Sequence, residues 1–284
     1  MPNTLKILAA DNHDRDAAGL HYVYPVVSRR AGGVSVGINL NPNNACNWAC
    51  VYCQVPDLQR GSAPPIDMLR LERELRGFLD ELLRGNFMQT RVPVEARRIV
   101  DVAISGNGEP TSAAEFPLVV DLIGRLLAEE GLAGQVVPRL ITNGSLMGRA
   151  AVQRGLARLG DLGGEAWFKV DAGSAGRMAA INGVPGDPGR VARHLARCAA
   201  LCPTWVQTCA FAMDGRGPSE ADIGDYLDLL ERAGTAKLAG VLLYGLARPS
   251  LQPGAAQLSA LHAEELQRIG ARISEKGLTV RVSP

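Results

Sequence analysis

Short apolar runs alternate with longer amphipathic stretches from about residue 34 onward. The apolar runs have the length of β-strands, and the stretches between them repeat apolar residues at helical spacing. The expected strands are 34–40, 99–105, 139–142, 166–171, 204–211 and 238–244. Six consecutive strand–helix units predict an α/β fold with a parallel sheet wrapped by helices, either an incomplete (β/α)6 barrel or an open doubly wound sheet.

The stretches between the strands carry helix signals. The first places five apolar residues on one helical face, namely Leu71, Leu75, Phe78, Leu79 and Leu82. Another begins at Ser219 with Asp222 three residues on, which is a weak capping-box signal. In both architectures the carboxyl ends of parallel strands meet at one edge, so chemistry is expected in the loops that follow the strands.

Composition narrows the class of protein. The chain has 284 residues, 46% of them apolar, and a formal net charge of +1. Its N-terminus lacks the basic and apolar segments of a signal peptide, and no apolar run reaches the roughly 18 residues of a membrane span. We therefore expect a soluble cytoplasmic protein without a membrane partner. The balanced charge gives no electrostatic footprint of a nucleic-acid-binding domain.

Six cysteines fall into two groups of three. Cys46, Cys50 and Cys53, the first cysteine group, lie within eight residues, shortly after the first expected strand. Thiolates are soft ligands that suit iron–sulfur clusters or zinc, and three of them can bind three irons of a 4Fe–4S cube while leaving the fourth iron open. A structural zinc site would need a fourth ligand, and His13 and His21 are the nearest histidines.

The second cysteine group consists of Cys198, Cys202 and Cys209. Cys198 and Cys202 are one helical turn apart, whereas Cys209 falls in an expected strand, so a common ligand set would need a particular bend of the chain. Buried free thiols are therefore favoured over an auxiliary cluster.

The spacing C-x3-C-x2-C, with Tyr52 before the last cysteine, resembles the motif that radical S-adenosylmethionine (SAM) enzymes carry after their first barrel strand. The resemblance covers Val34 to about Ser250 and implies a partial (β/α)6 radical SAM barrel with short N- and C-terminal extensions. The expected parts are an N-terminal extension over 1–30, the barrel over 31–250, and a C-terminal helix and strand packed on the barrel over 251–284.

The same resemblance assigns cofactors to this loop. It implies that Cys46, Cys50 and Cys53 ligate a 4Fe–4S cluster, that the open iron binds SAM, and that Tyr52 lies beside the adenine. One electron from an external donor of flavodoxin or ferredoxin type would then cleave SAM to a 5′-deoxyadenosyl radical. The second strand ends in a segment that looks like the family's glycine-rich contact to the methionyl amino group, with the candidates Gly106, Gly108 and Glu109.

The fourth strand reads Trp167-Phe-Lys-Val-Asp171, and period-two alternation puts Trp167, Lys169 and Asp171 on one face, which we expect to point into the barrel. The resemblance makes Asp171 a candidate for binding the SAM ribose. Lys169 is a catalytic candidate, binding a substrate carboxylate or acting as an acid–base group, because a buried ammonium must be hydrated, paired or functional. The alternative is a structural Lys169–Asp171 ion pair.

Further polar residues follow other strands. Asn143 stands where the family often presents polar side chains to SAM. The same segment, Thr142-Asn143-Gly144, is also typical of an ordinary turn at the end of a strand. Arg248 could clamp a carboxylate or phosphate, yet a lone arginine is more often part of a surface ion pair. The candidates for lining a substrate pocket are Gln207, Thr208, Tyr244 and Arg248.

Within the superfamily, the segments 106–110, 169–172 and 244–250 are similar to an Fe–S oxidoreductase group related to the wyosine-base synthases of transfer RNA. The chain lacks the extra N-terminal cysteines of those synthases and an evident basic RNA-binding extension. We therefore expect a minimal radical SAM oxidoreductase that takes a hydrogen atom from a small molecule. A tRNA base-modifying enzyme is the less favoured alternative, and a non-catalytic zinc-binding module is the alternative of another class.

Overall fold

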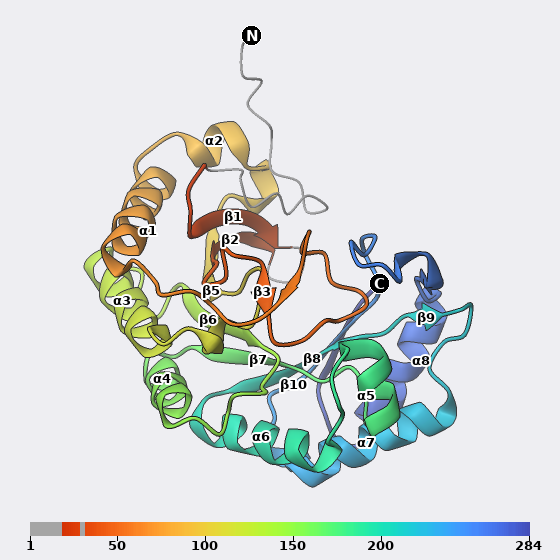
Figure 1. Cartoon of the computed structure of the whole chain (residues 1–284). Coiled ribbons are helices and arrows are strands. Elements are labelled where there is room, and N and C mark those ends of the chain that lie inside the picture. Colours follow the sequence, from red (N-terminus) through yellow and green to blue (C-terminus); the bar gives the residue numbers. More distant parts are fainter. Residues whose placement is uncertain (1–18, 29–31) are drawn as a thin grey trace.

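One eight-stranded sheet organises the protein (Figure 1). The computed structural model describes residues 19–28 and 32–284, and residues 1–18 of the expected N-terminal extension lie outside the described residues. In spatial order the strands are β1 (Val23–Ser28), β2 (Gly33–Ile38), β5 (Ile99–Ile104), β6 (Val137–Thr142), β7 (Glu165–Lys169), β8 (Thr204–Cys209), β10 (Gly240–Tyr244) and β12 (Val280–Ser283).

Two short ladders and a series of helices complete the described chain. The ladders are β3 (Ala45–Cys46) with β4 (Gln59–Arg60), and β9 (Ala212–Met213) with β11 (Leu258–Ser259). The α-helices are α1 (Met68–Leu83), α2 (Phe87–Arg91), α3 (Phe116–Glu129), α4 (Ala150–Asp161), α5 (Ala175–Asn182), α6 (Pro188–Leu201), α7 (Glu220–Ala233) and α8 (Ala263–Ser274). Single 3-10 turns are η1 (Val94–Ala96), η2 (Pro110–Ser112), η3 (Thr235–Lys237) and η4 (Ala255–Gln257).

The strand order decides between the two expected architectures. From β2 to β12 the strands are parallel and follow one another in chain order. A doubly wound sheet would reverse that order at a switch point, whereas successive crossovers of one hand build a barrel. The protein is therefore a partial barrel, and Figure 1 shows its helices in an arc outside the sheet.

All six expected strands are present, and the edges of the sheet add two more. At one edge β1 pairs with β2 in antiparallel fashion, and at the other β12 pairs with β10 in parallel fashion. The C-terminal strand thus extends the parallel sheet rather than packing beside it.

The expected helices have the expected buried faces and caps. The five apolar residues of α1 are all buried, and α7 begins with a complete capping box between Ser219 and Asp222. The sequence did not predict α2 or α5, which have only five and eight residues and no extended apolar periodicity. In the described part of the chain, no helix has the length and apolar character needed to cross a bilayer.

The barrel wall separates two apolar layers. Phe168 and Val170 belong to the main core between the sheet and the helices, whereas Trp167, Trp205 and Leu242 form a small cluster of their own. Because side chains alternate along a strand, this cluster lies inside the barrel, which confirms the alternation predicted around β7.

A buried ionic group fills the amino-terminal half of the barrel. The guanidinium of Arg139 lies 4.3 Å from the ring centre of Trp167 and donates to Glu165 at 2.8 Å. Arg139 also pairs with Asp101, which is 1% exposed. This half is closed by charges that satisfy one another, so the carboxyl half is left for chemistry.

Candidate functional site

Asparagines hold the loop of the first cysteine group, which follows β2 at the carboxyl end of the sheet. Asn39 Oδ1 accepts hydrogen bonds from the backbone N–H groups of Asn41 and Asn107, both at 3.0 Å. Asn41 Nδ2 donates to the carbonyl of Ala45 at 2.9 Å. Asn44 has a φ of 53°, a left-handed conformation that asparagine tolerates better than most residues. Side-chain bonds to the backbone therefore shape a loop that has little regular structure.

Gly106 and Gly108, in the segment after β5, pack directly against this loop. A Cβ atom at Gly106 would overlap Asn39 Oδ1, and one at Gly108 would overlap the carbonyl oxygen of Ala45. Gly106 also has a φ of 146°, which only glycine adopts readily. The glycine-rich segment and the cysteine loop are thus brought together as expected, while contact of either glycine with SAM stays a prediction.

Two sulfur atoms of the first cysteine group accept hydrogen bonds. Cys46 Sγ accepts one from the N–H of Trp48, and Cys50 Sγ accepts one from Asn182 Nδ2, each at 3.4 Å. Burial raises the pKa of Cys46 to about 11 and that of Cys50 to about 12, although the nearby Lys169 opposes the shift. Metal binding at these thiols must therefore release protons at neutral pH.

The three thiols of the first cysteine group match the donor set of a 4Fe–4S cluster. Among the described residues, no three or more His, Cys, Asp or Glu side chains gather closely enough to hold one ion. Sulfur atoms around one zinc would stand about 3.8 Å apart, given a Zn–S bond of about 2.3 Å, whereas the thiolates of a cube each bind a different iron. His13, one possible zinc ligand, lies outside the described residues. Three soft ligands on one fixed loop suit a 4Fe–4S cube with one open iron.

Glu109 is 2% exposed and bonds within the protein. Its Oε1 accepts from the hydroxyls of Thr111 and Thr142 at 2.5 and 2.6 Å, and its Oε2 accepts from the N–H of Asn143 at 2.6 Å. Burial raises the pKa of Glu109, against the effect of the threonine hydrogen bonds. This carboxyl group joins the ends of β5 and β6. A contact with the SAM ammonium would use the remaining acceptor capacity of Oε2 and stays a prediction.

Asn143 connects the loop after β6 to the cysteine loop. Its Nδ2 donates to Asn47 Oδ1 at 2.8 Å, and its Oδ1 accepts from the N–H of Ser145 at 3.0 Å. Asn47 Nδ2 in turn donates to Ser145 Oγ at 2.7 Å. From the helix side, His194 Nδ1 lies 2.8 Å from the carbonyl of Gly144. The candidate SAM residue Asn143 is thus also a structural link.

Asp171 is held by three donors. Its Oδ2 accepts from the hydroxyl of Tyr52 at 2.5 Å and from Asn182 Nδ2 at 2.9 Å, and its Oδ1 accepts from the N–H of Cys209 at 3.1 Å. Among the described residues, no carboxylate lies within ion-pair distance of Lys169, so the alternative of a Lys169–Asp171 ion pair does not hold. Asp171 instead fixes Tyr52 in place.

Lys169 lies beside the cysteine loop, over the ring of Tyr52. Its Nζ is 4.8 Å from the ring centre of Tyr52. Burial lowers the pKa of Lys169, but Tyr244, Asp171 and Cys50 outweigh burial and raise this pKa well above its usual value. A permanently charged ammonium is a poor general base. A raised pKa suits the binding of an anionic group, and both predicted roles of Lys169 stay predictions.

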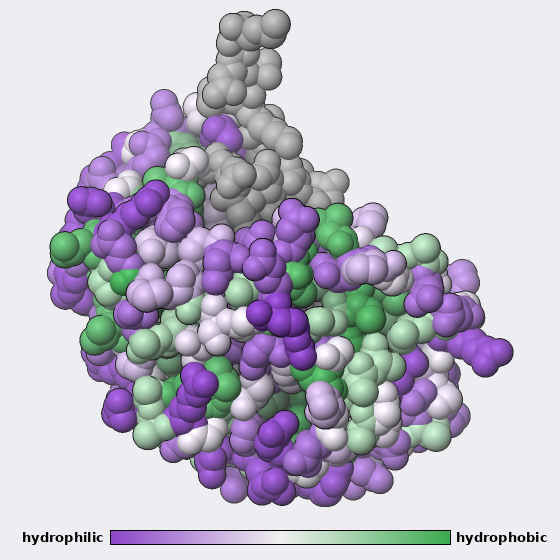
Figure 2. Space-filling model, in the orientation of Figure 1, coloured by the Kyte–Doolittle hydropathy of each residue, from purple (hydrophilic) through white to green (hydrophobic). Residues whose placement is uncertain are grey.

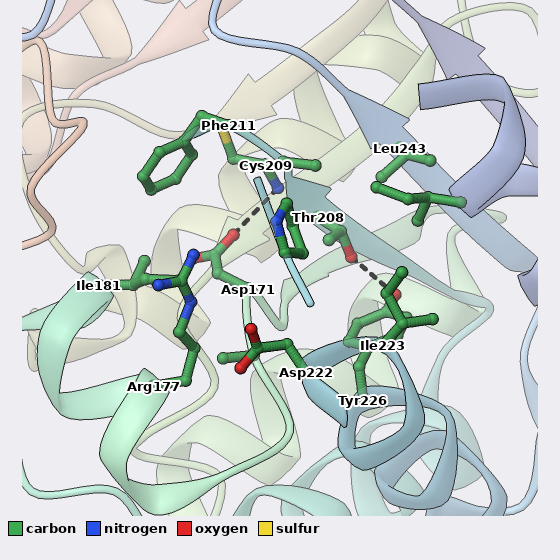
Figure 3. A pocket seen from close by; sticks show the side chains of 14 residues that line it. Asp171, Arg177, Ile181, Thr208, Cys209, Phe211, Asp222, Ile223, Tyr226 and Leu243 are labelled. Atoms are coloured by element: carbon green, nitrogen blue, oxygen red, sulfur yellow. Dashed lines mark hydrogen bonds between the residues drawn. The ribbon is translucent and has the colours of Figure 1, made fainter. Parts of the chain in front are cut away.

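A small cavity lies on the helix side of Asp171 (Figure 3). Its volume of about 40 Å³ suits a few water molecules but no organic substrate. Thr208 lines it and bonds the hydroxyl of Tyr226 at 2.7 Å. Neighbours on a strand point to opposite faces, so Gln207 and Thr208 do not share a face, and their role at a substrate pocket stays a prediction. Arg248 donates to Gln54 of the cysteine loop at 3.2 Å.

The second cysteine group is divided between the two ends of β8. Thr204 Oγ1, at the start of β8, lies 3.4 Å from Cys198 Sγ, and Cys202 ends helix α6 beside it. Cys209 ends β8 five residues later, about 16 Å away at roughly 3.3 Å per residue. All three thiols are free and buried. Sulfur atoms so far apart do not share a cluster.

Three residues of the site escaped the sequence reasoning: Asn47, Asn182 and His194. Asn47 lies in an asparagine-rich stretch typical of turns, and this local pattern does not indicate the partner of its side chain. Asn182 lies on the unpredicted helix α5, more than 120 residues after the loop that it contacts. His194 carried no signal, because its partner is a backbone carbonyl.

No family model matches the chain. Among curated proteins, a segment of 123 residues is 30% identical to the GTPase Obg of Brachyspira hyodysenteriae, and the match covers 43% of this chain and 15% of that protein. The chain thus spans only a small part of the length of this relative. The sequence of this chain contains no Gly-Lys pair, which a phosphate-binding P-loop requires. The match gives no family for the chain.

Solved structures match over most of the chain. A radical SAM methyltransferase from Sphaerobacter thermophilus has a TM-score of 0.59 at 14% identity, over 92% of this chain and 68% of that one. SuiB of Streptococcus suis, bound to SAM, has a TM-score of 0.54 at 11% identity, over 89% of this chain and 47% of SuiB. TYW1 with a lysine–pyruvate adduct has a TM-score of 0.51 at 16% identity, over 85% of this chain and 73% of TYW1. The chain therefore has the partial-barrel fold of the radical SAM enzymes.

Proposed function

We propose that this protein is a radical SAM enzyme that holds a 4Fe–4S cluster at Cys46, Cys50 and Cys53 and acts on a small molecule. The observation that carries the proposal is the position of these three thiols. They lie on one fixed loop at the carboxyl end of the barrel strands, packed against the glycine-rich segment and beside Lys169. In barrels of this kind the catalytic groups lie at that end.

A bound cluster would supply the electron that cleaves SAM into methionine and a 5′-deoxyadenosyl radical, which takes a hydrogen atom from the substrate. The protein's own groups position and shield that chemistry. Tyr52, which is 8% exposed and bonded to Asp171, covers one side of the site and limits water there. Lys169 offers a positive charge to an anionic group of SAM or of the substrate.

Anaerobic reconstitution tests the cofactor. The protein should bind about four irons and four sulfides per chain and become brown. With dithionite and SAM it should then release 5′-deoxyadenosine and methionine slowly, because background cleavage needs no substrate. A colourless protein that binds one zinc per chain would instead support the zinc-binding module.

Lys169→Met tests the substrate role of the ammonium. We expect the variant to keep its iron and its background release of 5′-deoxyadenosine but to lose substrate turnover. Full turnover by a folded Lys169→Met enzyme would contradict this role. Weakened SAM binding in the variant would assign the ammonium to SAM instead.

One observation favours the tRNA-modifying alternative as a second candidate. Helix α6 exposes Arg190, Arg193 and Arg197, and α4 beside it exposes Arg154. None of these four side chains forms an ion pair with another described residue, whereas Arg272 on α8 pairs with Glu220 at 2.6 Å. Figure 2 shows hydrophilic surface along the edge where α6 lies in Figure 1. Unpaired arginines on adjacent helices suit the phosphates of RNA.

Salt-dependent RNA binding separates the two candidates. If RNA is the substrate, the variant with glutamine at positions 190, 193 and 197 should bind transfer RNA at least tenfold more weakly and with a shallower salt dependence. The matched control is Arg268→Gln with Arg272→Gln, because these arginines are paired with Glu220. If the wild type, the α6 variant and the control variant all bind transfer RNA equally weakly, the small molecule stays the proposed substrate.

A further inference from the structure

Helix α5 ends against the loop of the first cysteine group. The N–H of Ala49 donates to the carbonyl of Asn182 at 3.0 Å, and the N–H of Val51 donates to the carbonyl of Ile181 at 2.8 Å. Carbonyls in the last turn of a helix have no partner within the helix. Here the N–H groups of the two residues that flank Cys50 supply that partner. These bonds fix the position of Cys50 relative to the end of α5.

Gly183 makes this close approach feasible. It follows α5 in the left-handed conformation, with a φ of 65°. A Cβ atom at this position would stand 2.7 Å from the carbonyl oxygen of Ala49. A larger residue would therefore push the helix end away from the cysteine loop, and the side chain of Asn182 would move with it.

The side chain of Asn182 is buried at 2% exposure, and its amide orientation is fixed by its neighbours. Asp171 Oδ2 accepts from Asn182 Nδ2 at 2.9 Å, and an amide donates hydrogen bonds only through its nitrogen. The amide nitrogen, not the oxygen, must therefore face Asp171. Since Tyr52 and the N–H of Cys209 hold Asp171 in place, the amide has no freedom to flip.

The second hydrogen of the same NH2 group points to Cys50. Asn182 Nδ2 lies 3.4 Å from Cys50 Sγ, and an amide nitrogen carries two donors, so both bonds form at once. Within the described residues, no other side-chain N–H donates to a sulfur of the first cysteine group. The hydrogen bond to Cys46 Sγ comes from the backbone N–H of Trp48.

We propose that Asn182 is a positioning residue that donates its amide N–H to the Cys50 sulfur and thereby raises the reduction potential of the cluster bound there. The inference rests on the proposed function, because it needs a cluster at this loop. Reduction adds negative charge to the cluster and its thiolates, and an N–H donor stabilises that charge. The donor thus favours the reduced state from which an electron passes to SAM.

Redox titration followed by electron paramagnetic resonance tests the proposal in wild-type protein and Asn182→Leu. At a fixed potential, the ratio of reduced to oxidised cluster should fall about tenfold in the variant, which is about 59 mV for a one-electron couple. The midpoint potential therefore becomes more negative. If Asn182→Leu does not take up a full cluster, Asn182→Ser provides the same comparison, since its hydroxyl is one bond shorter.

The matched control is Thr204→Val. Thr204 is also buried and also donates to a sulfur, but that sulfur is Cys198 Sγ at the other end of β8 and not one of the first cysteine group. Its replacement should leave the midpoint potential near that of the wild type. A wild-type potential in the Asn182 variants, or an equal shift in Thr204→Val, would overturn the role of Asn182. Wild-type protein that binds no iron would instead overturn the proposed function.

Discussion

The first cysteine group lies among polar loops at the carboxyl end of the barrel, whereas the second is part of the packed core. Around the first group, backbone and side-chain N–H groups reach the sulfur atoms of Cys46 and Cys50. Around the second group, Cys198 is completely buried, and Cys202 and Cys209 are each 3% exposed. Burial raises the pKa of Cys198 to about 12, close to that of Cys50.

The comparison shows that burial and thiol pKa do not separate the proposed cluster ligands from the cysteines of the other group. What differs is the geometry of the group as a whole. The first group belongs to one short loop, with three sulfur atoms that a single cofactor can reach. The second is divided between the end of α6 and the far end of β8, so its three sulfur atoms do not meet.

Replacing each cysteine group by alanine gives the largest expected contrast. The triple variant Cys46→Ala, Cys50→Ala, Cys53→Ala should lose all of about four irons per chain after reconstitution, because no ligand of the cube remains. The triple alanine variant of the second group should keep its iron. Iron content and the visible spectrum measure both. If the wild type instead bound about eight irons and the second-group variant only half of them, the second group would hold an auxiliary cluster.

Alkylation of the metal-free protein should separate the groups by at least about 100-fold in rate, because Cys198 reacts only after local or global opening. Only thiolates react, and the pKa of Cys46 is about 11. The rate at Cys46 should thus rise about tenfold for each unit of pH between 7 and 9. Mass spectrometry of iodoacetamide-treated protein measures both. Equally fast labelling of Cys198 would show that the core opens readily.

Glu109→Ala tests whether the polar end of the barrel depends on its buried carboxyl group. The change leaves the donors of Thr111, Thr142 and Asn143 without an acceptor, so the free energy of unfolding should fall by about 3 kcal/mol. If Glu109 also binds the SAM ammonium, the dissociation constant of SAM should rise about tenfold. Denaturant titration and calorimetry measure the two effects. A destabilised variant with unchanged SAM affinity would place the ammonium contact elsewhere.

Single alanine substitutions in the metal-free protein should give the smallest difference between the two cysteine groups. Here the second group should matter more than the first, the reverse of the expected effect on iron content. Cys198→Ala should lower the free energy of unfolding by about 1 kcal/mol, because it leaves a small cavity in the core. Cys53→Ala should change it by less than about 0.5 kcal/mol, since Cys53 is partly exposed. Chemical denaturation measures both. Equal losses would mean that Cys53 has a structural role of its own.

Much of the fold was predictable because it depends on local patterns. The six barrel strands and the helices α1, α3, α4, α6, α7 and α8 follow from apolar periodicity, and the capping box at Ser219 formed as expected. Strand β1 and helix α5 were missed. The first pairs across the edge of the sheet, and the second is too short to show a period, so tertiary contacts decide both.

The candidate site divides in the same way. The first cysteine group and the glycine-rich segment are contiguous in sequence, so their spacing could be recognised directly. The bond from Asn182 to Cys50 joins residues 132 apart, and the position of Cys209 behind Asp171 depends on the register of β7 against β8. Separations of that kind leave no local pattern.

The sequence by itself determined the succession of strands and helices, the loop of three thiols and the inward face that carries Lys169, because each depends on the order and period of neighbouring residues. The choice of a barrel over a doubly wound sheet came from the strand order. Only the tertiary structure decided that Asp171 bonds Tyr52 and Asn182 instead of Lys169, and that Thr208 faces the helices. The physical reason is that a buried polar group bonds whichever partner the packed chain brings within reach, and that partner comes from a different strand or helix.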